Sequence, residues 1–180
     1  MLLVVDNGSI YTKNLTGFLN EKNILFKEQT PQLLDINLLE NYDSIILSGR
    51  RKNEKKINEI NSKIVTYSIK NDIKLLGICY GAEILALTLG GTIRKTLSLQ
   101  KGNETIKIFK ENPISSDSLD VFESHWFEIS KLPSVLVPVA KSKNCKYEII
   151  QYEKKQIFGT QFHPEMSQNG HDLIEKFCSL

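Results

Sequence analysis

The sequence predicts an α/β fold, with a mostly parallel twisted sheet flanked by helices and a smaller antiparallel β portion in the second half. Two observations predict it. Over residues 1–90, short apolar runs alternate with segments of helical apolar spacing, which is typical of a parallel sheet covered on both faces. After residue 90, short strand-like runs follow one another without intervening helices. No repeat or linker interrupts the 180 residues, so we expect a single domain over 1–180.

The elements of the first half follow from two patterns. Short apolar runs that stop at turn residues predict buried strands, and these runs are residues 2–5, 25–28, 44–47 and 74–78. Apolar residues at i, i+3 and i+4 predict helices near 15–19, 33–41, 57–68 and 82–89. Gly90 and Gly91 follow the last of these helices, and such a pair is a natural stop.

The second half changes character because turn residues now separate strand-like runs directly. Short strands are expected within residues 92–109, 121–122, 135–140, 148–152 and 156–161. One more helix, over 172–177, is expected to close the chain.

The composition is that of an ordinary globular protein, with 41% hydrophobic and 24% charged residues. The net charge is only +2, which gives no general attraction to nucleic acid or to a membrane. The three cysteines have no paired spacing, which argues against disulfides and structural zinc. The first residues carry no basic leader. We therefore expect a cytoplasmic protein that uses no metal and binds neither nucleic acid nor membrane.

The most informative segment is Gly-Ile-Cys-Tyr-Gly at residues 77–81, where an apolar strand runs into a helical pattern. A nucleophile between two such glycines on a strand-to-helix turn is a nucleophile elbow, because larger flanking side chains would clash. The elbow also places Cys79 at a helix N-terminus, whose positive end favours the thiolate. A buried cysteine is often only a small apolar residue, and we assign Cys145 and Cys178 to that role.

A thiol nucleophile needs a base, and the base needs an orienting group. His163 ends a strand-like run and precedes Pro164 and Glu165. Proline restricts the backbone of the residue before it, so this step can aim an imidazole and a carboxylate into one site. We therefore expect Cys79, His163 and Glu165 to form a catalytic triad, in which Glu165 orients the ring.

These two motifs together resemble the class I (triad-type) glutamine amidotransferase family, and the similarity covers nearly the whole chain. The resemblance implies a flavodoxin-like fold and a reaction in which Cys79 attacks the side-chain amide of glutamine while His163 shuttles the proton. A γ-glutamyl thioester would form, ammonia would leave, and water would release glutamate. No metal or organic cofactor is implied. The resemblance also implies an oxyanion hole made by the backbone N–H of Tyr80 and by Gly49.

The sequence departs from the family pattern in two places. Arg50 and Arg51 replace the further glycine and proline that usually follow the glycine at position 49. Glu83 replaces a glutamine that helps to hold the substrate, and an ionised carboxylate can only accept hydrogen bonds. We expect Glu83 to lie in the substrate site and to alter affinity, substrate identity or pH optimum.

Residues 121–133 resemble the Ser-His segment of the family branch that serves GMP synthase, so Ser124, His125 and Trp126 are candidate substrate-binding residues. Phe127 stands where that branch carries an aspartate. The sequence holds no ATP-pyrophosphatase motif, so the expected partner is a synthetase subunit of that type. Three alternatives stay open: the glutaminase component of anthranilate or aminodeoxychorismate synthase, a stand-alone γ-glutamyl hydrolase, and a non-catalytic regulatory relative.

Overall fold

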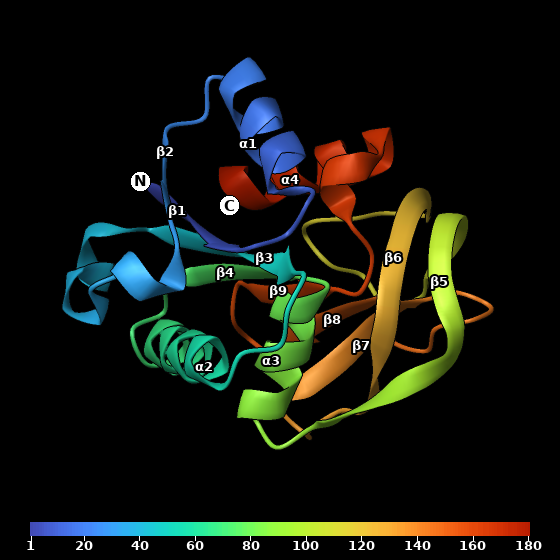
Figure 1. Cartoon of the computed structure of the whole chain (residues 1–180). Helices are drawn as coiled ribbons and strands as arrows, with labels where there is room; N and C mark the ends of the chain where they lie inside the picture. The colour runs from blue at the N-terminus through green and yellow to red at the C-terminus, as the bar shows by residue number, and fades with distance from the viewer.

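The computed structural model describes residues 1–180 as one nine-stranded sheet with helices on both faces (Figure 1). The strands are β1 (Leu2–Asn7), β2 (Phe26–Gln29), β3 (Ser44–Arg50), β4 (Lys74–Ile78), β5 (Thr92–Ile108), β6 (Ser118–Lys131), β7 (Leu136–Lys141), β8 (Ile149–Tyr152) and β9 (Ile157–Thr160). The α-helices are α1 (Thr12–Glu21), α2 (Lys55–Lys70), α3 (Tyr80–Thr88) and α4 (Gln168–Ser179). Three short 3₁₀ helices are η1 (Pro31–Leu33), η2 (Ile36–Asn41) and η3 (Pro164–Met166).

The sheet has a parallel half and an antiparallel half. Its strand order is β2-β1-β3-β4-β9-β8-β7-β5-β6, and the first five of these strands run parallel. The remaining strands pair antiparallel, from β8 against β9 to the β5–β6 hairpin. This arrangement confirms the predicted fold class. Because β3, β4 and β9 are parallel neighbours, their carboxyl ends meet at one edge of the sheet.

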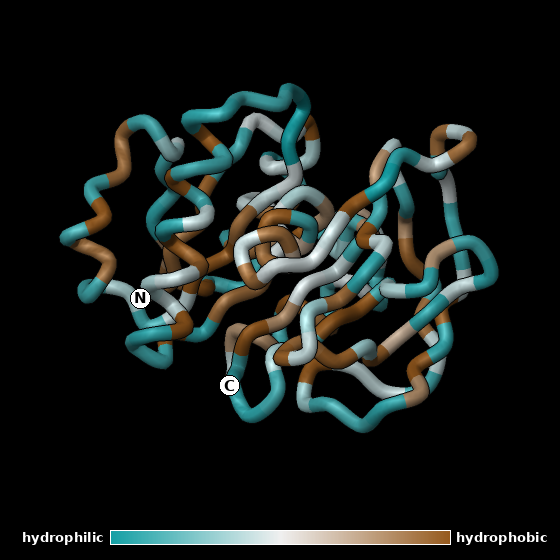
Figure 2. The backbone as a smooth tube through the Cα atoms, turned by 90° about the horizontal axis from the view of Figure 1, so that it is seen from below, coloured by the Kyte–Doolittle hydropathy of each residue, from teal (hydrophilic) through white to brown (hydrophobic).

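Two hydrophobic layers hold the helices to the sheet. Leu2 and Val4 of β1 contribute to the layer under α1 and α4, whereas Leu3 and Val5 contribute to the layer over α2 and α3. The alternation follows from the two-residue repeat of a strand. Apolar residues accordingly trace the centre of the molecule while polar ones dominate the outer loops (Figure 2). None of the four α-helices combines the length and hydropathy that crossing a membrane requires.

Several expected elements differ in the structure. The short strand expected at 121–122 is the 14-residue β6. The helix expected over 33–41 is two 3₁₀ turns, η1 and η2, and the Asp35 side chain between them accepts a hydrogen bond from the Asn37 N–H, which caps η2. Strand β3 continues past residue 47 to Arg50. The run expected to hold short strands, 92–109, is one long strand of 17 residues that pairs along most of β6, with the register shifted between Lys95 and Gln100. Such irregularities bend a long hairpin.

Candidate active site

The turn between β4 and α3 has the geometry of a nucleophile elbow. Cys79 is the junction residue, and its backbone lies at φ +51° and ψ −102°, a conformation that L-residues rarely adopt. A Cβ at Gly77 would lie 2.4 Å from the carbonyl group of Gly81, and a Cβ at Gly81 would lie 2.4 Å from the carbonyl oxygen of Leu47. Both flanking positions therefore have no room for a side chain, as the sequence predicted.

His163 reaches the same edge of the sheet through β9. Ile78 and Thr160 are register partners on β4 and β9, and the Cys79 N–H donates a 2.7 Å hydrogen bond to the Thr160 carbonyl. Three residues beyond Thr160, the His163 N–H donates to the Phe122 carbonyl of β6 at 2.8 Å. These two backbone hydrogen bonds hold His163 against β6 and Cys79 against β9, so the imidazole and the thiol lie side by side.

The three residues expected to act together are brought together. His163 Nδ1 donates to Glu165 Oε1 at 2.8 Å, which leaves Nε2 available, and the Cys79 thiol lies close enough for the two groups to shift each other's pKa. All three side chains are buried. The edge of the Tyr11 ring packs against the imidazole, with the ring centroids 4.7 Å apart. These contacts fix the orientation of the imidazole.

The pKa values of the pair are set by burial and by mutual charge. Burial raises the pKa of the Cys79 thiol, and the charge and hydrogen bond of His163 act in the opposite direction. Burial alone would lower the pKa of His163, but Glu165 and Cys79 together raise it well above its ordinary value. The expected lowering of the thiol pKa by the helix N-terminus is therefore outweighed by burial.

Gly49 and Tyr80 lie on either side of the same site. A Cβ at Gly49 would come within 2.9 Å of His163 Cε1, so this glycine borders the imidazole directly. Gly49 stands inside β3 and not on a loop after it, because the strand runs on to Arg50. As the first residue of α3, Tyr80 has no intrahelical acceptor for its N–H.

A buried polar network that sequence reasoning missed holds the Gly49 segment. The Asn7 N–H donates to Ser48 Oγ at 2.9 Å, and Asn7 Nδ2 donates to the Ser48 carbonyl at 3.0 Å. Asn61 Nδ2 of α2 donates in turn to Asn7 Oδ1 at 2.7 Å. Asn61 is fully buried. The sequence offers one indication of this role. Asn61 follows Ile57 by four residues, so its polar amide falls on the apolar face of α2.

A pocket of about 340 Å³ opens over the Cys79 thiol. It lies between the end of β3, the elbow and the β6 strand, and every residue proposed for substrate binding borders it. The lining residues are Arg50, Arg51, Asn53, Cys79, Tyr80, Glu83, Leu99, Ser124, His125, Trp126 and Phe127.

Arg50 is fixed at the mouth of this pocket. Its guanidinium lies over the Tyr80 ring, 4.1 Å from the centroid. Nη1 donates to Asn53 Oδ1 at 2.7 Å and to Asn58 Oδ1 at 2.8 Å. The Tyr80 hydroxyl donates to the same Asn58 oxygen at 2.8 Å. Asn58 therefore aligns both neighbours, a role that the sequence pattern did not reveal.

Glu83 points into the pocket from the first turn of α3. Its side chain is held by Gln161, whose Nε2 donates to Glu83 Oε1 at 3.4 Å and to the Phe127 carbonyl at 3.2 Å. Burial raises the pKa of Glu83, and the strongest opposing charge is that of Arg50. Gln161 is fully buried within the motif that carries His163, and its role went unrecognised because spacing does not show which way it points.

The hairpin supplies the opposite wall. Ser124 Oγ accepts a hydrogen bond from the Tyr11 hydroxyl at 3.2 Å, while Trp126 is about half exposed and has Lys95 Nζ 5.3 Å from its ring centroid. His125 Nδ1 donates to the Phe127 carbonyl at 2.9 Å, and its Nε2 lies 2.9 Å from Glu123 Oε2. Burial lowers the pKa of His125. His125 is thus a buried residue that forms part of the pocket lining.

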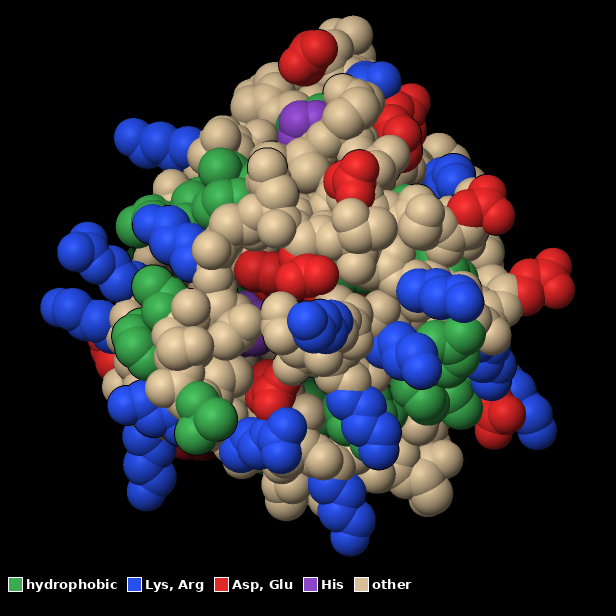
Figure 3. Space-filling view, turned by 90° about the vertical axis from the view of Figure 1, so that its right-hand side faces the viewer, with side chains coloured by type: hydrophobic (Ala, Val, Ile, Leu, Met, Phe, Trp, Pro, Cys, Tyr) green, Lys and Arg blue, Asp and Glu red, His purple; other side chains and the backbone are tan.

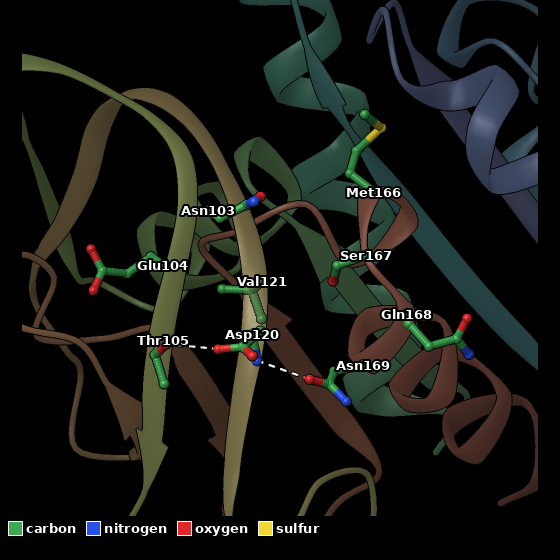
Figure 4. Close-up of a pocket in the computed structure, with 9 residues that line it drawn as sticks. All are labelled: Asn103, Glu104, Thr105, Asp120, Val121, Met166, Ser167, Gln168 and Asn169. Atoms are coloured by element: carbon green, nitrogen blue, oxygen red, sulfur yellow. Dashed lines mark hydrogen bonds between the residues drawn. The ribbon is translucent and has the colours of Figure 1, made fainter.

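A larger cavity, of about 550 Å³, lies elsewhere, between the β5–β6 hairpin and the start of α4 (Figure 4). Thr105 Oγ1 donates to Asp120 Oδ1 at 2.6 Å, and the Asp120 N–H donates to Asn169 Oδ1 at 2.9 Å (Figure 4). No cysteine, histidine or lysine lines it. Of the three residues expected to act together, Cys79 borders the smaller pocket, and His163 and Glu165 lie beside the thiol outside its lining. The smaller pocket is therefore the candidate active site.

The fold and this site define a class of protein. The family model described as glutamine amidotransferase class-I matches residues 3–179, so this chain belongs to that family. Among curated relatives, the GMP synthases [glutamine-hydrolyzing] of Aliivibrio fischeri and Vibrio vulnificus are 28% and 29% identical over 98% of this chain. The match covers 35% of each of those relatives, so the chain spans about a third of their length.

Solved structures agree with this assignment. A Thermoplasma acidophilum protein described as a GMP synthase subunit is 27% identical, covers 99% of this chain and 92% of its own, and superposes with a TM-score of 0.88. A glutamine amidotransferase of Thermotoga maritima, 22% identical, covers 97% of this chain and 80% of its own with a TM-score of 0.79 and shares the fold. The expected resemblance to the branch that serves GMP synthase is confirmed.

Proposed function

We propose that residues 1–180 form one glutaminase domain that hydrolyses the side-chain amide of glutamine through Cys79, His163 and Glu165. One observation carries the proposal. A thiol on a strained elbow contacts an imidazole whose other nitrogen is bound by a buried carboxylate at 2.8 Å, and a pocket of about 340 Å³ opens over the thiol. A nucleophile, a base and an orienting acid in this order are the parts that acyl transfer requires.

The contacts support a specific sequence of proton transfers. His163 takes the proton of the Cys79 thiol as the sulfur attacks the amide carbon, and the N–H of Tyr80 is placed to stabilise the oxyanion. The imidazolium then gives its proton to the leaving nitrogen, and the C–N bond breaks to release ammonia and leave a thioester. A water molecule, deprotonated by His163, attacks the thioester. The thiol regains its proton as glutamate departs. Glu165 keeps the ring in the required tautomer throughout.

The direct test is ammonia release from glutamine by the purified protein, alone and with a candidate partner. Cys79→Ala should reduce release by at least ~10⁴-fold, because the nucleophile of a triad cannot be replaced by its neighbours. Cys178→Ala is the matched control, since Cys178 is a free, half-buried thiol on α4. An electrophilic glutamine analogue should label Cys79 alone. Full ammonia release by Cys79→Ala would refute the proposal.

We further propose that the ammonia passes to a synthetase of the ATP-pyrophosphatase type, as part of GMP synthesis. Two findings support this partner. The relatives are named GMP synthases, and this chain aligns with only about a third of their length. The three cysteines are free, which suits action in the reducing cytoplasm. A surface for the partner stands at the rim of the pocket, where Leu97 is fully exposed and Trp126 and Phe127 are nearly half exposed. Figure 3 shows the side of the molecule on which β5 and β6 lie, where Lys and Arg side chains surround apolar ones.

The partner proposal has its own test. A GMP-forming synthetase should raise ammonia release by this chain, and Leu97→Ser should weaken that stimulation because burying an exposed leucine against a partner contributes about 1.5–3 kcal/mol. Leu33→Ser is the control, since Leu33 on η1 is also well exposed but lies away from the hairpin. Equal stimulation of both variants would place the partner elsewhere.

A further inference from the structure

The carboxylate of Glu165 is held by a hydrogen bond at only one of its two oxygens. Oε1 accepts from His163 Nδ1 at 2.8 Å, whereas Oε2 is buried and has no hydrogen-bond partner in the protein. One contact to an imidazole sets a distance but leaves the direction of the carboxylate open, so the direction depends on what fixes the backbone of Glu165.

A side chain of α4 holds that backbone. His171 Nε2 donates a hydrogen bond to the carbonyl oxygen of Glu165 at 3.2 Å, and the imidazole supplies the proton because a carbonyl can only accept. His171 lies near the start of α4, whereas Glu165 belongs to η3. His171 is outside the lining of the active-site pocket, so any effect on the chemistry passes through Glu165.

The imidazole of His171 is itself fixed by α1. It stacks on the Phe18 ring, with the ring centroids 4.2 Å apart and the two planes inclined by 16°. Phe18 is 5% exposed and belongs to the hydrophobic layer that α1 and α4 share. The plane of the His171 ring is therefore set by packing, and its Nε2 atom approaches Glu165 from a defined direction.

The start of α4 is also packed directly against η3. A Cβ at Gly170 would lie 2.2 Å from the carbonyl oxygen of Pro164, so no side chain fits there. Ser167 ends η3 and caps α4, since its Oγ accepts from the Gly170 N–H at 3.2 Å. Asn169 Oδ1 accepts from a backbone N–H of β6 at 2.9 Å (Figure 4). The turn that carries His171 is thus held against both η3 and β6.

We propose that His171 is a positioning residue for the triad. By holding the carbonyl of Glu165, it sets the direction of the carboxylate and, through it, the orientation of the His163 imidazole. The inference rests on the proposed function, in which that imidazole transfers the protons. Such a contact acts on the chemical steps and leaves substrate binding unchanged, because a ring turned away from the reacting atoms transfers protons poorly.

Two substitutions separate the N–H of His171 from its ring. His171→Phe keeps an aromatic ring and loses the donor, whereas His171→Gln keeps an Nε2 donor and loses the ring. We expect His171→Phe to lower kcat for ammonia release by about 10-fold or more, with KM within about 2-fold, because misplacing a catalytic group by ~1 Å costs up to about 100-fold. His171→Gln should keep kcat within about 3-fold of the wild-type value.

A role confined to packing gives the opposite order. If His171 only joined α1 to α4, His171→Gln, which loses the stack on Phe18, would lower kcat at least as much as His171→Phe. Gln168→Ala is the matched control, since Gln168 Nε2 donates to Asp172 Oδ1 at 3.1 Å within α4, and it should change neither kcat nor KM. Should circular dichroism show that His171→Phe is unfolded, His171→Ala takes its place in the comparison.

A spectroscopic measurement separates this inference from the proposed function. The nitrogen resonances of the His163 ring report its tautomer and its bond to Glu165 without substrate, and His163→Gln identifies them among three histidines. His171→Phe should shift these resonances, and His171→Gln should leave them in place. That result supports the positioning role even if the wild-type protein releases no ammonia. Unchanged resonances in His171→Phe reject the role, whatever the kcat, and leave the proposed function standing if ammonia is released.

Discussion

The two walls of the active site are built on different principles. At the elbow wall, which comprises the ends of β4 and β9 with Cys79, His163 and Glu165, backbone atoms approach so closely that two glycines are required. At the hairpin wall, formed by residues 123–127 of β6, side chains line the pocket, and the buried side chains of Glu123 and His125 contact each other. The comparison indicates that backbone packing fixes the positions of the proposed catalytic residues, whereas the residues proposed to bind substrate or partner contribute side chains that can be replaced without disturbing the backbone.

The sharpest test of that contrast is Glu165→Gln at the elbow wall. An amide in place of the carboxylate can still contact the ring, but it no longer stabilises the imidazolium or enforces the tautomer that leaves Nε2 facing Cys79. We expect kcat for ammonia release to fall by about 10²–10⁴-fold with a small change in KM. Glu175→Gln on α4, at an exposed pair with Lys22, should change neither constant. A loss below about 3-fold for Glu165→Gln would show that the elbow wall tolerates change too.

A second test asks whether the elbow is fixed by space. In Gly81→Ala the new Cβ would meet the Leu47 carbonyl oxygen at 2.4 Å, so backbone must move. We expect the free energy of unfolding to fall by about 1–3 kcal/mol, measured by urea denaturation, together with loss of activity. Gly17→Ala is a matched control within α1, where the added Cβ meets nothing within 4 Å. That change should stabilise the protein by up to about 1 kcal/mol.

The third test concerns the acids behind the hairpin wall. Glu148 is fully buried, and neither of its carboxylate oxygens has a hydrogen-bond partner. Glu123 is buried as well, beside the Nε2 atom of His125. Burial raises the pKa of Glu123 to about 7, and burial and the charge of Glu123 raise the pKa of Glu148 well above its ordinary value. The folded protein therefore holds these protons to higher pH than the unfolded chain does.

The sign of the pH effect follows from this difference. Below pH ~4.3, the ordinary glutamate pKa, both states bind the proton and ionisation has no effect on stability. Between pH ~4.3 and about 7 the unfolded chain loses the proton while the folded one keeps it, so stability falls as the pH rises through this window and levels off above it. Glu148→Gln should remove the share of this loss that belongs to Glu148 and gain about 1–2 kcal/mol of stability at pH 8 relative to pH 5, while Glu123 continues to titrate. The exposed Glu153→Gln should give a pH-independent result.

The same division explains how much could be predicted from sequence. The elbow and the His-Pro-Glu step lie in short contiguous motifs whose glycines and proline express backbone constraints, so Cys79 and His163 could be named and expected to meet where parallel strands end. The β5–β6 hairpin could not be drawn, because its pairing joins residues far apart in sequence and shifts register midway.

The direction in which a side chain points was the other feature that could not be predicted from the sequence. Gln161, Asn58 and Asn61 all hold parts of the site, yet an amide in a helix or strand gives no sign in the sequence of what it contacts. The segment 33–41 was misjudged for a related reason. Its apolar spacing fits a helix, but the Asp35 side chain caps a tighter turn that starts within it.

The smallest expected effect lies at the rim of the hairpin wall. Trp126 is 47% exposed, with Lys95 Nζ 5.3 Å from its ring centroid, and it borders the substrate pocket. Trp126→Ala should raise the KM for glutamine by a few-fold at most and change the free energy of unfolding by less than about 1 kcal/mol, because exposed cation–π contacts contribute roughly 0.5–1 kcal/mol. Steady-state kinetics and urea denaturation measure the two quantities.

Phe109 provides a close control for this last change, since it is 50% exposed and has Lys141 Nζ 5.9 Å from its ring centroid, but it lies outside the pocket lining. Phe109→Ala should match Trp126→Ala in stability and leave KM unchanged. If Trp126→Ala lowered kcat by about two orders of magnitude, the contrast between the walls would fail, because a half-exposed aromatic on the hairpin would then position the reacting groups. A KM effect without a kcat effect places Trp126 among the residues that bind substrate and leaves the chemistry to the elbow.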